Sequence, residues 1–328
     1  MRPPITCGLY YYLNDSMNVI FVSRSKTGKP LPFVKEQADF LTKNFQVDVQ
    51  HFLISKGGVF GYLTAILQLR DFVQKKKPDI VHVHYGLWAL VAVFSKLISL
   101  SKHKIIITFH GSDINKQTER YFGLLASYLA SHSILVSPKM VKYFKSNYSI
   151  IPCGVDTNVN QCDRHKIRFE NGWGKADFVI LFSSSFNRPV KDPEFAFKVV
   201  DAFSKVSPRP VRFIELKGYT RDQLNGIMQA ADALILSSIM EGSPQVIKES
   251  IINSLPIVSN NVGDVAAICS GIDNCFIINK EVDAYVRCLQ SLSSTQNRIT
   301  NRTPVLERFD NNIISKQIFE IYSTVLTN

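Results

Sequence analysis

The strongest constraint on the fold is a regular alternation of short apolar runs with helix-length segments along the 328-residue chain. The runs are rich in Val and Ile, and they are apolar throughout instead of alternately apolar and polar. Such strands are buried on both faces, which is typical of parallel sheets covered by helices on each side. The sequence therefore predicts an α/β protein with strands at Asn18–Arg24, Asp48–Ile54, Ile80–Tyr85, Lys104–His110, Ile134–Ser137, Ser149–Pro152, Phe178–Ser183, Val211–Leu216, Ala233–Ser237, Pro256–Ser259 and Cys275–Ile278.

The segments between these strands place apolar residues at helical spacing. A polar stretch, Gly154–Lys175, separates two halves that each contain the whole pattern. We expect two doubly wound Rossmann-like domains, residues 1–155 and 156–310, followed by a helical tail at 311–328. Ligands of such sheets bind at the carboxyl ends of the strands, and a cleft between two facing domains is the expected site. The predicted helices are Pro32–Asn44, Phe60–Lys75, Leu87–Leu100, Asp192–Val206, Arg221–Ala231, Pro244–Ser254, Val282–Leu292 and Arg308–Leu326.

Composition excludes several classes of protein. A chain with 45% hydrophobic and 20% charged residues is not disordered. No apolar run approaches the ~20 residues that a membrane-spanning helix needs. The six cysteines show no CxxC pair and no zinc-type spacing, which indicates free thiols in a reducing compartment. The first sixteen residues lack the features of a signal peptide, so we expect a cytoplasmic protein in which they are either a loose extension or an artefact of the choice of start site.

The net charge of +11 is confined to the first half of the chain. Residues 1–155 hold 19 Lys and Arg against 8 Asp and Glu, an excess of 11, whereas the rest of the chain is balanced at 19 of each. A basic half favours an anionic partner, such as a lipid phosphate or peripheral contact with an anionic inner membrane. The plain alternative is a solvated basic face. Nucleic acid is not expected, because no RNA-binding aromatic signature, zinc finger or helix-turn-helix is present.

The most informative segment is Ala233–Gly263, in which a buried strand leads through a short loop into a helix. The loop carries Glu241, Gly242 and Ser243, and Pro244 suits the first turn of the helix because its missing N–H is no loss there. Gly242 lets the backbone approach a ligand closely. The helix N-terminus offers free N–H groups and a partial positive charge, which suit a diphosphate.

Two carboxylates flank this predicted anion site. Glu241 lies in the loop and Glu249 lies on the helix, with seven residues between them. Carboxylates so placed can accept hydrogen bonds from sugar or ribose hydroxyls beside a phosphate. A helix with an acidic first turn is the structural alternative, and the surrounding strand, loop and glycine turn argue against it.

This segment resembles the donor-binding segment of the retaining GT-B glycosyltransferases of family 4, also described as glycosyl transferases group 1. Those proteins carry an EGxP loop, a Glu-x7-Glu pair and then a strand with a glycine turn. Three further segments are similar in the same order along the chain: PDIVHVHYG (Pro78–Gly86), ITFHGSDI (Ile107–Ile114) and SIIPCGVDT (Ser149–Thr157). In the last of these Cys153 stands where the family usually has Asn. The resemblance covers roughly residues 18 to 325. The opening segments NVIFVSR and PFVKEQADFL are similar to those of a subset of the family found in bacterial surface-polysaccharide loci.

The resemblance implies a GT-B fold whose C-terminal helix, 311–328, crosses back to the first domain. It implies a hexosyltransferase that moves a sugar from a nucleotide-diphosphate sugar to a glycan or lipid-linked acceptor with retention of configuration. In such enzymes Glu249 would bind ribose, while Glu241 with Gly242, Ser243 and Pro244 would orient the sugar and its phosphates. Lys191 would stabilise the leaving diphosphate. His110 would hydrogen-bond the transferred sugar, although a lone strand-end His is otherwise a structural residue.

Several further positions carry alternatives. Arg188 could neutralise the diphosphate, but the family places its Arg at the position of Phe186, so Arg188 is a substitute or a solvated cation. Gly28, in a basic loop after the first strand, and Gly111 are expected on the acceptor side. Asp113 could reach the acceptor, although capping of the following helix is favoured.

No metal or other cofactor is predicted, since no Asp-x-Asp motif appears and His82 with His84 lack a third ligand. Buried, hydrogen-bonded histidines are the favoured interpretation of that pair. Two other functions stay open. One is a nucleotide-sugar epimerase of the same architecture, and the other is a non-catalytic sugar-nucleotide-binding subunit of a glycan assembly complex.

Overall fold

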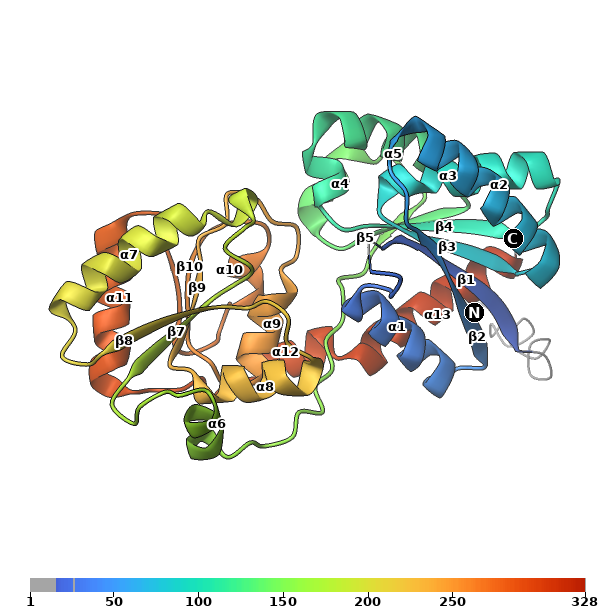
Figure 1. The fold of residues 1–328 in the computed structure, drawn as a ribbon. Helices are drawn as coiled ribbons and strands as arrows, with labels where there is room; N and C mark the ends of the chain where they lie inside the picture. Colours follow the sequence, from blue (N-terminus) through green and yellow to red (C-terminus); the bar gives the residue numbers. More distant parts are fainter. Residues whose placement is uncertain (1–15, 26, 328) are drawn as a thin grey trace, which may run out of the picture. The chain divides into compact units, whose positions relative to one another are not determined.

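The computed structural model describes residues 16–25 and 27–327, and it divides into two compact units. Nearly all of the predicted N-terminal extension therefore lies outside the described residues. Unit 1 comprises the described residues up to Gly154 and those from Asn311 onward, and unit 2 is Val155–Asp310. Each unit is a parallel sheet between two layers of helices, as Figure 1 shows, so the prediction of two doubly wound α/β domains is confirmed.

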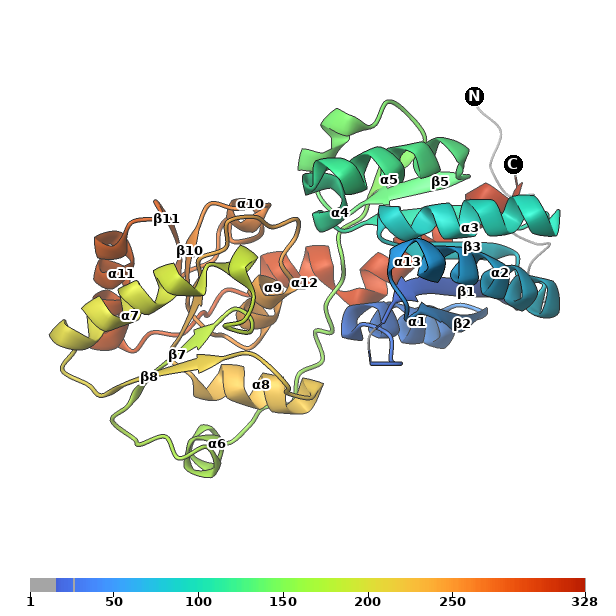
Figure 2. The same cartoon turned by 45° about the horizontal axis from the view of Figure 1, so that its top comes forward.

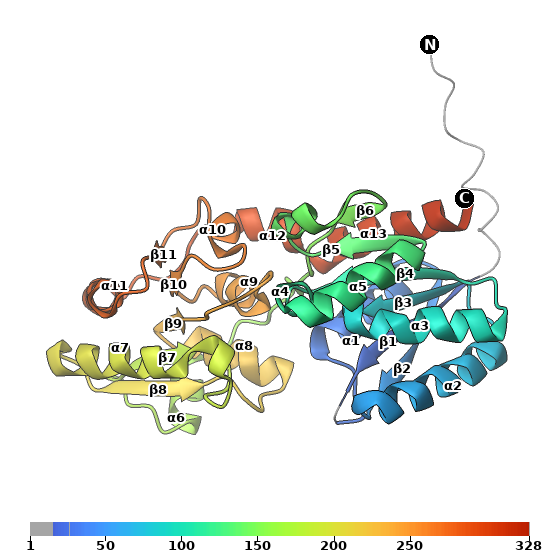
Figure 3. The same cartoon turned by 90° about the horizontal axis from the view of Figure 1, so that it is seen from above.

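Unit 1 contains six parallel strands in the order β2-β1-β3-β4-β5-β6. One face of the sheet is covered by α2, α3 and α5 and the other by α1 and the C-terminal helix α13 (Figures 1 and 3). The elements are β1 (Met17–Arg24), α1 (Pro32–Asn44), β2 (Val47–Ile54), α2 (Gly58–Lys76), β3 (Ile80–His84), α3 (Gly86–Ser99), β4 (Lys104–Phe109), α4 (Ser112–Asn115), α5 (Gln117–Leu129), β5 (His132–Leu135), β6 (Tyr148–Ile150) and α13 (Asn311–Thr327).

Unit 2 repeats this winding with five parallel strands in the order β11-β10-β9-β7-β8. Helices α7 and α11 cover one face and α8, α9 and α12 the other (Figure 2). The elements are α6 (Arg164–Glu170), β7 (Phe178–Phe182), the 3-10 turn η2 (Pro189–Lys191), α7 (Pro193–Val206), β8 (Val211–Glu215), α8 (Arg221–Ala230), β9 (Ala233–Leu236), α9 (Gln245–Ile252), β10 (Ile257–Asn260), α10 (Val265–Ile268), β11 (Cys275–Ile278), α11 (Val282–Thr295) and α12 (Thr303–Phe309).

The apolar strands explain these layers directly. Successive side chains of a strand point to opposite faces, so a run without polar positions must be covered twice. In β1, Ile20 packs with the core beneath α2 and α3, whereas Val19 and Phe21 pack with the core beneath α1 and α13. All eleven predicted strands are present, with ends that shift by at most two residues.

One helix was not predicted, and one prediction was wrong. The stretch Gly154–Lys175 contains helix α6, whose N-cap Asp163 accepts hydrogen bonds from the first N–H groups. The tail is not one helix from Arg308. The backbone at Asp310 is extended and forms a bridge with Val155, which separates α12 from α13. A hydrogen bond from the N–H of Val155 to the carbonyl of Phe309 (2.8 Å) holds this break.

Helix α13 is joined to the sheet of unit 1 by a buried polar contact as well as by apolar packing. The hydroxyl of Tyr322 lies 2.5 Å from Nδ1 of His82, and Nε2 of that ring lies 2.7 Å from the hydroxyl of Thr108. Burial lowers the pKa of His82 to about 3, so the ring is neutral and both of its nitrogens are satisfied. The predicted interpretation of His82 as a buried, hydrogen-bonded residue is therefore confirmed.

Tyr322→Phe should lower the free energy of unfolding of unit 1 by about 1–3 kcal/mol, because it leaves a buried ring nitrogen without a partner. The two tryptophans, Trp88 and Trp173, lie in different units, so a Trp173→Phe background lets fluorescence report urea unfolding of unit 1 alone. The control is Tyr128→Phe, whose ring is 88% exposed on α5. Equal stability of the two variants would contradict the structural role of Tyr322.

Candidate active site

The loop that follows β9 in unit 2 is built by the turn into α9. Strand β9 ends at Leu236, and Ser237 and Ser238 behind it are fully buried. Helix α9 begins at Gln245, one residue later than predicted, and Pro244 is its N-cap with extended backbone. The loop residues Glu241, Gly242 and Ser243 therefore lie at the carboxyl end of the strand, directly before the N-terminus of a helix.

Glu241 is paired with Lys191 inside this loop region. The Nζ of Lys191 forms an ion pair with Glu241, and the hydroxyl of Ser238 donates to the same carboxylate at 2.6 Å. Lys191 ends η2 behind β7, and it is held there because Ser237 donates to its carbonyl at 2.9 Å. Two predicted site residues from loops 50 positions apart are thus brought together.

The glycine turn after β10 supports the same loop. Gly263 has a positive φ of 57°, and a Cβ there would lie 2.5 Å from the carbonyl oxygen of Gly242 and 2.9 Å from Cβ of Glu241. The N–H of Asp264 donates to that carbonyl at 3.1 Å. The conjunction of an EGxP loop with a later glycine turn thus has a physical basis: the two turns pack on each other, and only glycine fits.

Glu249 forms a second, separate ion pair. Its carboxylate lies on α9, is 9% exposed, and pairs with Arg221 at the start of α8. The two glutamates of the Glu-x7-Glu pattern therefore have different cation partners. Nothing in the sequence signalled Arg221, because it lies in a different helix and in no recognisable motif.

Two further residues predicted to bind the donor, Arg188 and Ser243, differ in their exposure to solvent. Arg188 is exposed and donates to the hydroxyl of Ser184 at 3.2 Å. Phe186, at the position where the family has Arg, packs in an aromatic cluster with Phe182 and Phe213. The hydroxyl of Ser243 is buried without a hydrogen-bond partner among the described residues.

In unit 1, His110 is half-buried at the end of β4, between two polar neighbours. Its Nε2 lies 3.2 Å from Nδ1 of His84, and its Nδ1 lies 3.4 Å from Sγ of Cys153. Burial lowers the pKa of His84 well below its ordinary value, so this neighbour is neutral. The sequence singled out Cys153 as a departure from the family pattern, and the structure places it against the candidate histidine.

No group of three His, Cys, Asp or Glu side chains in the described residues could hold a metal ion.

Asp113 fixes the turn that carries His110. Its carboxylate is 1% exposed and accepts hydrogen bonds from the N–H groups of Gly86 (2.8 Å), His110 (3.0 Å) and Gly111 (2.8 Å). Burial raises the pKa of Asp113 to about 6 in spite of these bonds. Asp113 is thus a positioning residue for the turn, and its carboxylate bonds N–H groups before α4 instead of capping it. Gly111 has a φ of 104°, whereas Gly28 lies in an exposed turn with open space around it.

Comparison with known proteins gives one match to each unit. Residues 16–159 match the model of Glycosyltransferase Family 4, and residues 191–295 match that of Glycosyl transferases group 1. TuaC of Bacillus subtilis (strain 168), named as a glycosyltransferase of teichuronic acid biosynthesis, is 23% identical over 65% of this chain. The chain spans 60% of the length of that relative.

Solved structures share the fold. Anabaena HepE, crystallised with UDP and glucose, has a TM-score of 0.72 at 17% identity over 94% of this chain and 100% of its own. The UDP-GlcNAc 2-epimerase of Methanocaldococcus jannaschii has a TM-score of 0.62 at 13% identity, with coverage of 94% and 100%. One glycosyltransferase family model thus matches each half of the chain, and the fold that the chain shares with the solved structures is GT-B.

Proposed function

We propose that the protein is a retaining hexosyltransferase that takes a sugar from a nucleotide-diphosphate donor and passes it to a glycan or lipid-linked acceptor in surface-polysaccharide synthesis. The observation that carries the proposal is the cluster of Lys191, Glu241 and Ser238 before the N-terminus of α9. A lysine and a helix N-terminus together suit a diphosphate, and a carboxylate beside them suits sugar hydroxyls. HepE, which binds UDP-glucose, and TuaC, by its name, support the donor class and the pathway.

The chemistry then follows from where negative charge develops. As the diphosphate leaves, Lys191 and the α9 N-terminus stabilise it, which is the main catalytic task. Lys191 can turn from Glu241 to the phosphates because an ammonium group carries three donors, and Glu241 becomes free to accept from the sugar. Glu249 accepts from ribose, with Arg188 and the amides of Gly242 to Pro244 as further donor contacts. His110, which Asp113 positions through the turn at Gly111, hydrogen-bonds the transferred sugar in this proposal.

The first test is a donor screen that detects released UDP or GDP with and without acceptor. Release that depends on acceptor, with the donor's anomeric configuration kept in the product by NMR, supports the proposal. Epimerised donor without acceptor would establish the epimerase alternative. Binding without turnover would establish the non-catalytic alternative.

Glu241→Gln should reduce kcat by about 10²–10³-fold, as the loss of one preorganised electrostatic group does in other active sites. The amide oxygen can still accept from Lys191, so the melting temperature should change little. Glu194→Gln, at an exposed position of α7, is the matched control and should keep full turnover. Unfolding that accompanies the loss of turnover would show that Glu241 is structural.

We also propose that catalysis needs no bound metal, since Lys191 and the helix N-terminus take the place of a cation at the diphosphate. Turnover of enzyme dialysed against EDTA should equal that of untreated enzyme. Complete loss of turnover, restored by Mg²⁺ or Mn²⁺, would contradict this.

We also propose that a surface of unit 1 makes peripheral contact with the cytoplasmic face of a membrane. No helix in the described residues is long and apolar enough to span a membrane. Helices α2, α3 and α5 lie side by side (Figure 3) and carry exposed apolar side chains beside lysines such as Lys75 and Lys77. Apolar groups flanked by cations suit an anionic bilayer surface. The exposed apolar side chains are Val59, Phe60, Leu63, Leu67, Phe94, Leu97, Ile98, Leu100, Tyr121, Phe122, Leu125, Tyr128 and Leu129.

The protein should sediment with anionic phosphatidylglycerol vesicles but not with phosphatidylcholine vesicles, and less at high ionic strength. Phe60→Ser together with Leu63→Ser should weaken this binding several-fold. The matched control is Phe169→Ser in unit 2, because Phe169 and Phe60 are both 85% exposed. Equal binding by both variants would remove this surface from the proposal.

A further inference from the structure

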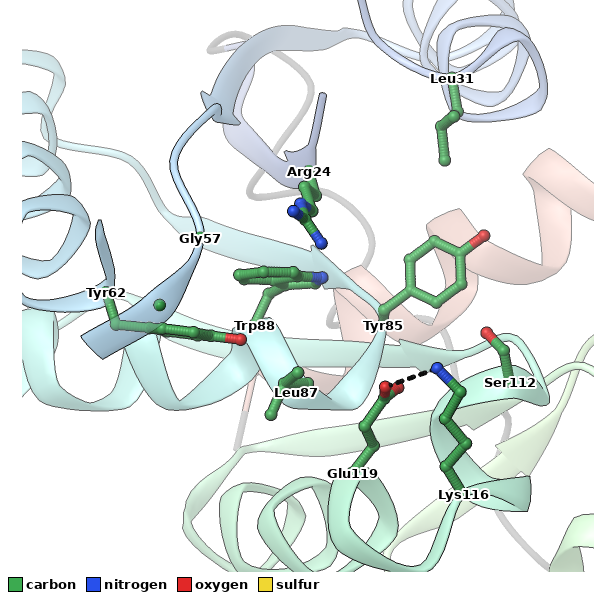
Figure 4. A pocket seen from close by; sticks show the side chains of 11 residues that line it. Arg24, Leu31, Gly57, Tyr62, Tyr85, Leu87, Trp88, Ser112, Lys116 and Glu119 are labelled. Atoms are coloured by element: carbon green, nitrogen blue, oxygen red, sulfur yellow. Dashed lines mark hydrogen bonds and ion pairs between the residues drawn. The ribbon is translucent and has the colours of Figure 1, made fainter. Parts of the chain in front are cut away.

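Unit 1 holds a cavity of about 390 Å³ at the carboxyl ends of its strands, shown in Figure 4. Arg24 ends β1, Gly57 follows β2, Tyr85 follows β3, and Ser112 follows β4. The cavity therefore lies where the order β2-β1-β3 reverses the winding of the sheet, which is the place where ligands of such sheets bind. We call it the β1–β3 pocket.

One wall of the β1–β3 pocket is an aromatic stack. The rings of Tyr62 and Trp88 are parallel to within 11°, with centroids 4.9 Å apart. The guanidinium group of Arg24 lies over the Trp88 ring, 5.2 Å from its centroid, and Figure 4 shows Arg24 and Tyr62 on opposite sides of that ring. Both faces of the Trp88 ring are therefore covered, and the stack holds the guanidinium group of Arg24 at the wall of the pocket.

Arg24 supplies a cation that the protein does not neutralise. Its Nε is buried without a hydrogen-bond partner, and no carboxylate of the described residues forms an ion pair with it. The second cation of the pocket, Lys116, is paired with Glu119 at 3.0 Å, so the lining keeps one net positive charge. A buried donor without a partner is costly, and a carboxylate or phosphate completes a guanidinium fork with two hydrogen bonds.

Tyr85 connects the β1–β3 pocket to the candidate histidine. It is a non-glycine residue with a φ of 75°, a strained conformation that clusters at functional sites. The N–H of Tyr85 is bonded to the carbonyl of Thr108 at 2.9 Å, and a Cβ on the next residue, Gly86, would lie 2.3 Å from the Phe109 ring. The turn cannot relax, and the Tyr85 ring stays 4.5 Å from that of His110.

We propose that the β1–β3 pocket binds the acceptor and selects an anionic saccharide, whose ring packs on Tyr85 and whose oxyanion accepts from the guanidinium group of Arg24. The statement that the bound saccharide is the acceptor rests on the proposed transferase function. The pocket's preference for an anionic sugar can be measured without turnover. Its oxyanion is the carboxylate of a uronic acid or the phosphate of a sugar phosphate.

The test uses Trp88 fluorescence in the Trp173→Phe chain. Methyl glucuronide, glucose 6-phosphate and methyl glucoside serve as carboxylate, phosphate and neutral probes. At least one anionic probe should change the fluorescence saturably, with an affinity at least tenfold higher than that of the neutral probe. The anionic probe that binds more tightly shows whether the preferred oxyanion is a carboxylate or a phosphate. Arg24→Gln should remove this difference, and Arg24→Lys, which keeps the charge but not the fork, should reduce it. Arg70→Gln, outside the pocket on α2, should leave it unchanged.

Equal affinity for neutral and anionic probes, or an unchanged preference in a folded Arg24→Gln variant, would overturn the inference. Thermal melting followed by circular dichroism shows that the variants are folded. Glu241→Gln should leave probe binding intact, because Glu241 lies in unit 2. Probe binding without any donor turnover in the parent chain would therefore refute the proposed transferase and not the pocket.

Discussion

The whole molecule depends on one constraint of parallel sheets: the loops on either side of the strand where the winding reverses must diverge. In each unit the second strand lies on one side of the first strand and the third strand lies on the other side. The winding therefore reverses between β1 and β3 in unit 1 and between β7 and β9 in unit 2. Diverging loops leave room for polar side chains at the strand ends, where no helix covers them. The Lys191–Glu241 pair lies at one of these points and Arg24 with Tyr85 at the other.

The charges at the two ends of the unit 2 sheet have different consequences. At the amino end of β9, Asp232 pairs with Arg164 and Arg168 and also accepts from the N–H of Val179 at 2.7 Å. Every partner there is internal, so the network closes and stabilises the sheet. At the carboxyl end, the Lys191–Glu241 pair lies beside an unpaired Ser243 hydroxyl and a helix N-terminus. The proposed donor binds at this end, where it takes over partners of the Lys191–Glu241 pair.

The sequence contained enough information for the strands and for the main donor-side loop, because both depend on local patterns. Buried runs of Val and Ile predict strands, and a strand followed by EGSP predicts a turn into a helix. Contacts between distant segments leave no such pattern. The partner of Glu249 is Arg221, and that of His110 is His84, each 26 or more positions away. The break at Asp310 was missed for the same reason, since its bridge partner Val155 is distant in the sequence.

The position of α13 has a consequence for synthesis on the ribosome. Unit 2 is a single uninterrupted stretch, whereas unit 1 needs residues 311–327 to cover Met17, Val19 and Phe21 on one face of its sheet. Translation yields the N-terminal residues first, so that face stays uncovered until residues 311–327 have been made. Chaperones would meet an early domain that is finished only after the later one, and termination of synthesis before residue 311 would leave apolar strands exposed.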